Sequence, residues 1–140
     1  MKYALIVIVV LATLAIGYLA FAALIVNPRV ERELREDPDG ARARKAMLIT
    51  LPGGRTIPVN YLREGDVIYA GADGRWWREL RGDGAPVRLL VRGEALEGRA
   101  RAIEDDPSRR ADVFSRLRPT ALKFAGTLVQ IDLVVEKNGD

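Results

Sequence analysis

The feature that most constrains this chain is an apolar run without a charge from Tyr3 to Val26. At about 1.5 Å per residue, a helix of this length exceeds the roughly 30 Å hydrocarbon core of a bilayer. Buried helices of small soluble domains are rarely apolar on every face. We therefore expect residues 1–27 to form a retained N-terminal transmembrane anchor. The alternative is a cleaved signal peptide, because Ala20-Phe21-Ala22 resembles a small-x-small cleavage site.

The residues that flank this run predict its orientation. Only Lys2 precedes it, whereas a series of basic residues follows it closely: Arg29, Arg32, Arg35, Arg42, Arg44 and Lys45. The positive-inside rule therefore places the C-terminal part of the chain in the cytoplasm. Residues 28–45 carry both charge signs and offer little to bury. We expect them to form a solvated, charged juxtamembrane linker with one or two helical turns.

Short apolar segments separated by turn residues predict a mainly β domain over residues 46–136. Ile57, Val59 and Tyr61 recur with the period of two that marks a half-buried strand. Strands are expected at 46–50, 56–61, 67–70, 86–92, 95–103 and 126–135, and short helices at 76–81 and 108–118. Antiparallel strands at this spacing favour a small six-stranded barrel, followed by a tail at 137–140.

The second helix has a clear start. Asp106 is expected to cap it and Pro107 to occupy its first position. Its inward face should carry Ala111, Phe114 and Leu117. Pro119 should end it.

The composition excludes most chemistry that a protein performs with its own side chains. Without cysteine there is no disulfide or thiolate nucleophile, and without histidine there is no Ser-His-Asp triad. A reaction would therefore depend on carboxylates, hydroxyls, arginines or a bound cofactor. The net charge of +3 is spread along the chain, which argues against a nucleic-acid partner. Glu104, Asp105 and Asp106 form a cluster of carboxylates, but helix capping explains Asp106. We therefore expect no metal site there. A folded part this small favours a homodimer.

Residues 55–81 form the most informative unit, because a hairpin, a glycine loop and a tryptophan pair follow one another. Gly53, Gly54 and Arg55 can present backbone N–H groups and a guanidinium to a phosphate. An ordinary hairpin turn with an exposed arginine explains them as well. The small residues Ala70, Gly71 and Ala72 can let a flat ring approach the backbone. A bulge or the start of a loop is the alternative.

The tryptophan pair divides into two roles. Trp76 and Trp77 are adjacent, so they cannot share one face of a helix. We expect one of them in the core and the other at a ligand pocket, a dimer interface or a membrane interface. Arg78 and Arg81 can jointly face an anion or lipid headgroups, or simply be solvated.

The order of these motifs resembles the deazaflavin-dependent nitroreductase family. The likeness covers roughly Met47 to Val135 and is most specific between Gly53 and Val91. It comprises an Arg-Thr-Ile-Pro-Val strand, an Arg-Glu-Gly-Asp turn, a Val-Ile-Tyr-Ala strand, Trp-Trp-Arg-Glu-Leu and a Pro-Val-Arg-Leu-Leu-Val-Arg-Gly strand. It implies a split β-barrel, related in fold to the FMN-binding pyridoxamine-phosphate oxidases. It also implies an oxidoreductase in which a reduced deazaflavin or FMN transfers hydride to an organic acceptor of the quinone or nitro type.

Carried onto this sequence, the resemblance implies a cofactor site without a catalytic side chain and without a metal. The site comprises Gly53, Gly54, Arg55, Thr56, Pro58, Asn60, Ala70, Gly71, Ala72, Trp76, Trp77 and Arg78. Two departures favour an alternative, in which the barrel is a non-catalytic, membrane-tethered binding or scaffold module that has lost its cofactor. The turn that ends at Arg55 is short, and Glu79 stands where the family commonly has asparagine.

Overall fold

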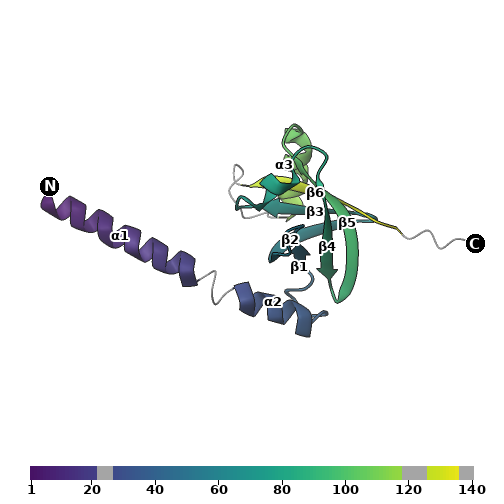
Figure 1. Ribbon diagram of the computed structural model, residues 1–140, viewed down its shortest axis with the longest axis horizontal. Helices are drawn as coiled ribbons and strands as arrows, with labels where there is room; N and C mark the ends of the chain where they lie inside the picture. The colour runs from purple at the N-terminus through teal and green to yellow at the C-terminus, as the bar shows by residue number, and fades with distance from the viewer. Residues whose placement is uncertain (22–26, 118–125, 136–140) are drawn as a thin grey trace, which may run out of the picture.

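The first element of the chain is a helix that lies clear of the remainder. The computed structural model describes residues 1–21, 27–117 and 126–135. Its first helix, α1 (Lys2–Phe21), buries no residue and projects away from the rest of the chain (Figure 1). By length and composition α1 can cross a membrane, and a signal sequence near an N-terminus passes the same test. Residues 22–26 at the end of the predicted anchor, Pro119 and the tail lie outside the described residues.

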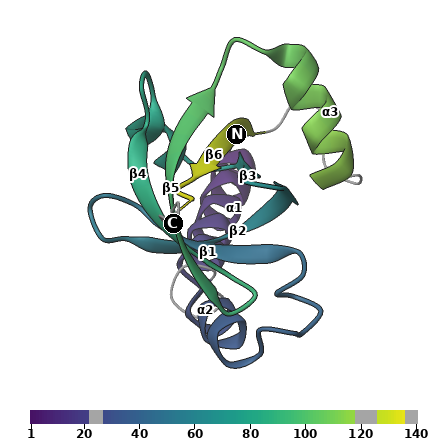
Figure 2. The ribbon, with the colours of Figure 1, turned by 90° about the vertical axis from the view of Figure 1, so that its right-hand side faces the viewer.

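Six antiparallel strands form a closed barrel. They are β1 (Ala46–Thr50), β2 (Thr56–Glu64), β3 (Val67–Ala72), β4 (Ala85–Val91), β5 (Glu94–Ile103) and β6 (Thr127–Leu133). Their order around the barrel is β1-β2-β3-β6-β5-β4 (Figures 1 and 2). Hairpins join β1 to β2, β2 to β3 and β4 to β5, and the β1–β4, β3–β6 and β5–β6 pairings complete the ring. The predicted mainly β, six-stranded antiparallel architecture is confirmed.

The barrel interior is filled by alternate side chains of every strand. Ile49 lies opposite both Ile57 and Leu89, and Ile68 lies opposite Ile131. Ile49, Ile68 and Ile131 are fully buried. Burial of each such side chain is worth about 1.5–3 kcal/mol. The core-facing row predicted for the hairpin is confirmed, because Ile57, Val59 and Tyr61 all contact this core.

A helix joins the membrane-length segment to the barrel. In α2 (Asn27–Glu36), Val30 and Leu34 stand one helical turn apart and pack with Leu48 on the outer face of β1. Leu34 is only 3% exposed. Figure 2 shows α2 below β1. The expectation that this segment has little to bury was wrong here, because it counted charges and overlooked the pair of apolar residues on one face.

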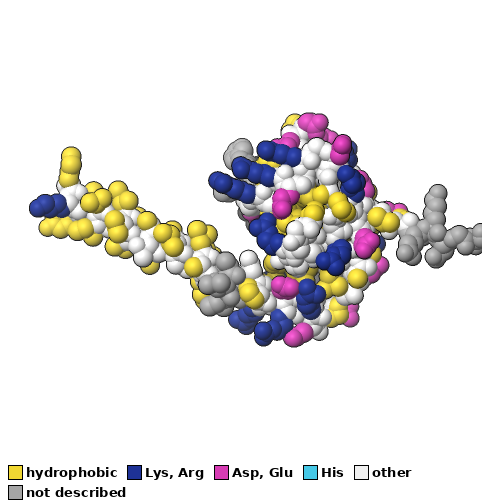
Figure 3. Space-filling view, viewed as in Figure 1, with side chains coloured by type: hydrophobic (Ala, Val, Ile, Leu, Met, Phe, Trp, Pro, Cys, Tyr) yellow, Lys and Arg dark blue, Asp and Glu magenta, His cyan; other side chains and the backbone are white. Residues whose placement is uncertain are grey.

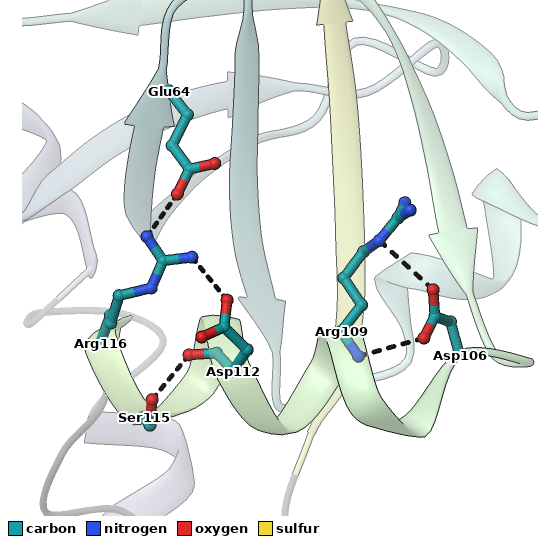
Figure 4. Close-up of polar contacts among 6 residues, drawn as sticks. All are labelled: Glu64, Asp106, Arg109, Asp112, Ser115 and Arg116. Carbon is teal, nitrogen blue, oxygen red and sulfur yellow. Dashed lines mark hydrogen bonds and ion pairs between the residues drawn. The ribbon is translucent and has the colours of Figure 1, made fainter.

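A second helix covers the opposite side of the barrel. The Asp106 carboxylate accepts a hydrogen bond of 3.0 Å from the backbone N–H of Arg109, so the predicted cap of α3 (Pro107–Leu117) is confirmed. Arg116 pairs with Asp112 within the helix and with Glu64 on β2 (Figure 4). Arg116 fastens the end of the helix to β2, and near its start Arg109 donates a hydrogen bond of 2.8 Å to the Gln130 side chain of β6.

The inward face of α3 differs in part from the prediction. Val113 and Phe114 are 1% and 8% exposed and pack with Leu128 of β6, with Leu117 beside them. Ala111 is exposed, so that part of the prediction was wrong. The larger apolar residues Val113 and Phe114 set the rotation of the helix on the sheet. The helix expected after β3 is a short 3-10 helix, η2 (Trp76–Leu80), in which Trp76 and Leu80 are buried.

The docking of α2 can be tested by truncating its buried side chain. Leu34→Ala should destabilise the docked helix by about 2 kcal/mol, because a cavity replaces the contact with Leu48. Amide hydrogen exchange of α2 should then accelerate by roughly thirtyfold, while exchange in β4 and β5 stays unchanged. Glu36→Ala, an exposed change at the end of the same helix, is the matched control. Equal exchange rates in the two variants would show that α2 is not held by Leu34.

Candidate functional site

A groove lies between the start of α2, residues 57–60 of β2 and the loop that follows β3. Its volume is about 370 Å³. We call it the β2 groove. Its lining residues are Asn27, Val30, Arg42, Ala46, Ile57, Pro58, Val59, Asn60, Gly71, Asp73, Gly74 and Trp76. They come from segments far apart in the sequence, which the closed barrel and the docked helix bring together.

A second hollow adjoins the β2 groove. It shares Ile57, Gly74 and Trp76 with the groove and adds Arg55, Arg75 and Glu79, with a volume of about 390 Å³. We call it the Arg55 pocket. Each volume lies in the range of roughly 300–1,000 Å³ that is typical of small-molecule sites. Because the two hollows share residues, one extended ligand can occupy both.

The boundary between the two hollows is held by packing. Trp76 is 9% exposed and belongs to the barrel core, so its ring has a fixed position. Gly74 is exposed and has no side chain, which leaves its backbone open to a flat ligand. Asn60 is exposed on β2 and offers both an amide donor and an acceptor. The β2 groove therefore has an aromatic and apolar floor with a polar edge.

The Arg55 pocket carries opposite charges. The guanidinium of Arg55 lies 3.7 Å from the Glu79 carboxylate, and both side chains are more than half exposed. An exposed pair of this kind contributes only about 0.2–1 kcal/mol in water. Arg75 is exposed beside it and has no ion-pair partner among the described residues. An anionic ligand can therefore compete with Glu79 for Arg55 and gain a second cation from Arg75.

Tyr61 positions the chain segment on one side of the β2 groove. Its hydroxyl donates a hydrogen bond of 3.1 Å to the carbonyl oxygen of Ala43, which lies between the lining residues Arg42 and Ala46. Burial raises the pKa of Tyr61 above its ordinary value of 10.0, and the nearby charges of Arg92 and Arg63 oppose this in part. The phenol therefore stays a neutral donor at neutral pH.

The structure brings some of the predicted site residues together. Pro58, Asn60, Gly71 and Trp76 line the β2 groove, and Arg55 lines the adjoining pocket. These five come from β2, the end of β3, η2 and the turn before β2. They form one continuous surface.

The other predicted residues lie away from the lining of the two hollows. Ala70 and Ala72 are buried in the barrel core. The Thr56 hydroxyl is within 2.8 Å of the Thr50 hydroxyl on β1, and Gly53 and Gly54 lie in the exposed turn between these strands. Arg78 lies over the Trp77 ring at 5.8 Å, and Arg81 lies over the same ring at 4.6 Å.

Sequence reasoning missed the contribution of α2. Asn27 and Val30 line the β2 groove, as do Asp73 and Gly74 in the loop after β3. The spacing of Val30 and Leu34 is a weak amphipathic signal that pointed to a docked helix. Nothing local indicated which strand the helix would cover.

The chemistry available at this site is binding and orientation. The chain has neither histidine nor cysteine. Among the described residues, no group of three or more acidic side chains is placed to hold a metal ion. The site can bind a flat ring against Trp76 and Pro58 and an anion beside Arg55 and Arg75.

Comparisons with known proteins give structural likeness only. No protein-family model and no curated protein matches the sequence. A solved structure of a candidate general stress protein 26 from Jannaschia sp. CCS1 is 17% identical with a TM-score of 0.47. That match covers 76% of this chain and 74% of the other.

Two further solved structures show a similar level of likeness. A candidate pyridoxamine 5′-phosphate oxidase from Listeria innocua is 17% identical with a TM-score of 0.47, over 75% of this chain and 95% of that chain. An FAD-binding protein from Mesorhizobium loti is 17% identical with a TM-score of 0.44, over 74% of this chain and 89% of that chain. Likeness at this level of identity and TM-score assigns no activity to the chain.

The role of Tyr61 predicts a dependence of stability on pH. The folded protein holds the phenolic proton more tightly than the unfolded chain, because the pKa is raised on folding. This contribution is complete below pH 10.0 and is lost as the pH rises through the folded-state pKa. Tyr61→Phe should cost about 1 kcal/mol at neutral pH through the lost hydrogen bond. It should also flatten the fall of the unfolding free energy at alkaline pH.

Urea unfolding of the detergent-solubilised chain at neutral and alkaline pH measures both effects. Tyr69→Phe on β3 is the matched control, because it removes another half-buried tyrosine hydroxyl. Parallel pH profiles for the wild type and Tyr61→Phe would contradict the role given to Tyr61.

Proposed function

We propose that the chain is a membrane-anchored oxidoreductase that binds a flavin, either a deazaflavin or FMN, along the β2 groove. When bound, such a cofactor supplies the hydride for reduction of an organic acceptor of the quinone or nitro type. The motif resemblance of residues 53–91 supports the cofactor class. The absence of histidine and cysteine agrees with a reaction that needs no protein nucleophile.

One observation carries the proposal. Pro58, Asn60, Gly71 and Trp76 line a single groove although they come from β2, β3 and η2, and Arg55 lies at the end of the adjoining pocket. A flat ring and an anionic tail are the two parts of a flavin phosphate. The groove offers an apolar floor for the first, and Arg55 in the adjoining pocket offers a cation for the second.

The residues of the chain have separate tasks in this proposal. Trp76 and Pro58 bind the ring and exclude water from one of its faces. Asn60 orients the ring by hydrogen bonds to its polar edge. Arg55 holds the anionic tail. The acceptor enters from the open side of the groove.

The proposal includes the anchor and a homodimer. The helix α1 is long and apolar enough to span a bilayer. Retention of α1 and a cytoplasmic barrel are proposed from the basic residues that follow it. A homodimer is proposed because a domain of this size buries a modest fraction of its surface alone. Sedimentation of the solubilised chain measures the oligomeric state.

A second candidate function has its own supporting observation. Glu79 already pairs with Arg55, so the cation expected to hold a phosphate is partly neutralised within the chain. In this version the barrel is a tethered binding or scaffold module without a cofactor. The two candidates differ in whether any flavin binds.

Charge substitutions in the Arg55 pocket test the cofactor. Glu79→Gln should tighten FMN binding by about two- to fivefold and Arg55→Gln should weaken it by a similar factor, as expected for exposed ion pairs. Riboflavin, which lacks the phosphate, should show neither change. Fluorescence titration of the detergent-solubilised full chain with FMN, a deazaflavin and riboflavin measures the affinities.

Arg88→Gln is the matched control, because it removes an exposed arginine from β4 outside the lining of both hollows. Failure of every flavin to bind at micromolar concentration would exclude the oxidoreductase and leave the scaffold module. If Glu79→Gln changed the affinities for FMN and riboflavin equally, the phosphate of FMN would not bind in the Arg55 pocket.

A reporter fused after Asp140 tests the orientation. A reporter enzyme that is active only in the cytoplasm should be active, because Arg29 and the basic residues after it follow the span. Alkaline extraction of membranes should leave the chain in the pellet. A soluble chain that begins after Ala22 would instead establish the signal peptide.

A further inference from the structure

The exposed arginines at the start of α2 are not neutralised by the acids of the same helix. Glu31 pairs with Arg35 at 3.0 Å, and Glu33 pairs with Arg42 at 2.8 Å. Arg29 and Arg32 are exposed and have no ion-pair partner among the described residues. The uncompensated positive charge of α2 therefore lies in its first two turns, the end next to α1.

The loop before η2 adds positive charge on the other side of the β2 groove. Asn27 and Val30, which flank Arg29 in the sequence, line the same groove as Gly74 and Trp76. Arg75 lies between those two residues and is exposed. Arg78 is also exposed and lies over the Trp77 ring at 5.8 Å. The acids of this loop region are Asp73 and Glu79, and Glu79 is paired with Arg55.

The connection to α1 limits how far this surface can be from a bilayer. The chain has six residue steps between Phe21 at the end of α1 and Asn27 at the start of α2. At about 3.5 Å for each step, these residues reach at most roughly 20 Å. If α1 spans the hydrocarbon core, the first turn of α2 is therefore within reach of the headgroup layer. Because Leu34 packs α2 against β1, the barrel is held near the bilayer together with α2.

We propose that Arg29, Arg32, Arg75 and Arg78 form a surface that binds the headgroups of anionic phospholipids. We call these four residues the arginine rim. Figure 3 shows Lys and Arg side chains over α2 and along the neighbouring edge of the barrel. The inference rests on the membrane anchoring in the proposed function. The arginine rim seats the open side of the β2 groove on the bilayer, so that an acceptor dissolved in the lipid enters without crossing water.

The experiment uses the full chain in vesicles and its own fluorescence. The two tryptophans of the chain, Trp76 and Trp77, lie beside the arginine rim and serve as donors. A trace of lipid with a dansyl group on its headgroup serves as acceptor. Energy transfer should be higher in phosphatidylcholine vesicles that contain phosphatidylglycerol than in pure phosphatidylcholine. This increase in energy transfer with phosphatidylglycerol should vanish at high salt, because salt screens exposed charges.

Variants identify the residues. Arg32→Gln/Arg75→Gln removes one cation from α2 and one from the loop before η2 and keeps Arg29, so the signal that orients α1 is preserved. At least half of the phosphatidylglycerol-dependent increment should be lost. The control Arg88→Gln/Arg101→Gln removes the same charge from β4 and β5 and should keep the increment. Equal transfer in both kinds of vesicle, or equal losses in the two variants, would overturn the arginine rim.

The same vesicles separate this inference from the proposed function. Flotation reports anchoring, and FMN titration reports the cofactor. If the chain floats and binds FMN but its energy transfer does not depend on phosphatidylglycerol, the arginine rim does not bind anionic lipid. The proposed oxidoreductase function is then unaffected. If energy transfer depends on phosphatidylglycerol but no flavin binds, the lipid-binding role of the arginine rim is supported and the proposed flavin cofactor is excluded. A chain that does not float overturns both anchoring and the arginine rim.

Discussion

Closure of the sheet is the constraint on which the rest of this structure depends. The pairings of β1 with β4 and of β3 with β6 use the backbone groups that an open sheet would leave at its edges. Closure decides which face of each strand is inside. It also fixes the outer face of β1 and β2 as the surface on which α2 can pack. The β2 groove exists because a helix from outside the barrel lies against that surface.

The electrostatic arrangement follows from this placement. Arginines on the surface pair with acids from distant segments, such as Arg116 with Glu64 and Arg81 with Glu104. The cations that remain around the β2 groove come from α2 and from the loop before η2. Their proximity results from tertiary packing, since Arg29 and Arg75 are far apart in sequence. A groove and exposed cations are thereby combined on one side of the barrel.

Much of the architecture was predictable from local patterns. Short apolar or alternating segments between turn residues located every strand, and β1 was predicted with its observed ends. The cap at Asp106 was predicted from residue type alone, because the side chain satisfies an N–H of the first turn wherever the helix lies. The rotation of α3 was predicted only in part. Val113 faces inward and Ala111 does not, because the apolar surface of β6 decides which face is covered.

The candidate site shows the same division. Successive residues of a strand point to opposite faces, so Ala70, Gly71 and Ala72 could not all face a ligand. The sequence by itself determined that a strand stood there, that the N-terminal run could span a membrane, and that no histidine or cysteine was available. Only the tertiary structure decided that Gly71 lines the groove while Ala70 and Ala72 pack in the barrel core, that Glu79 reaches Arg55, and that α2 completes the groove. These outcomes depend on contacts between distant segments, which local periodicity does not encode.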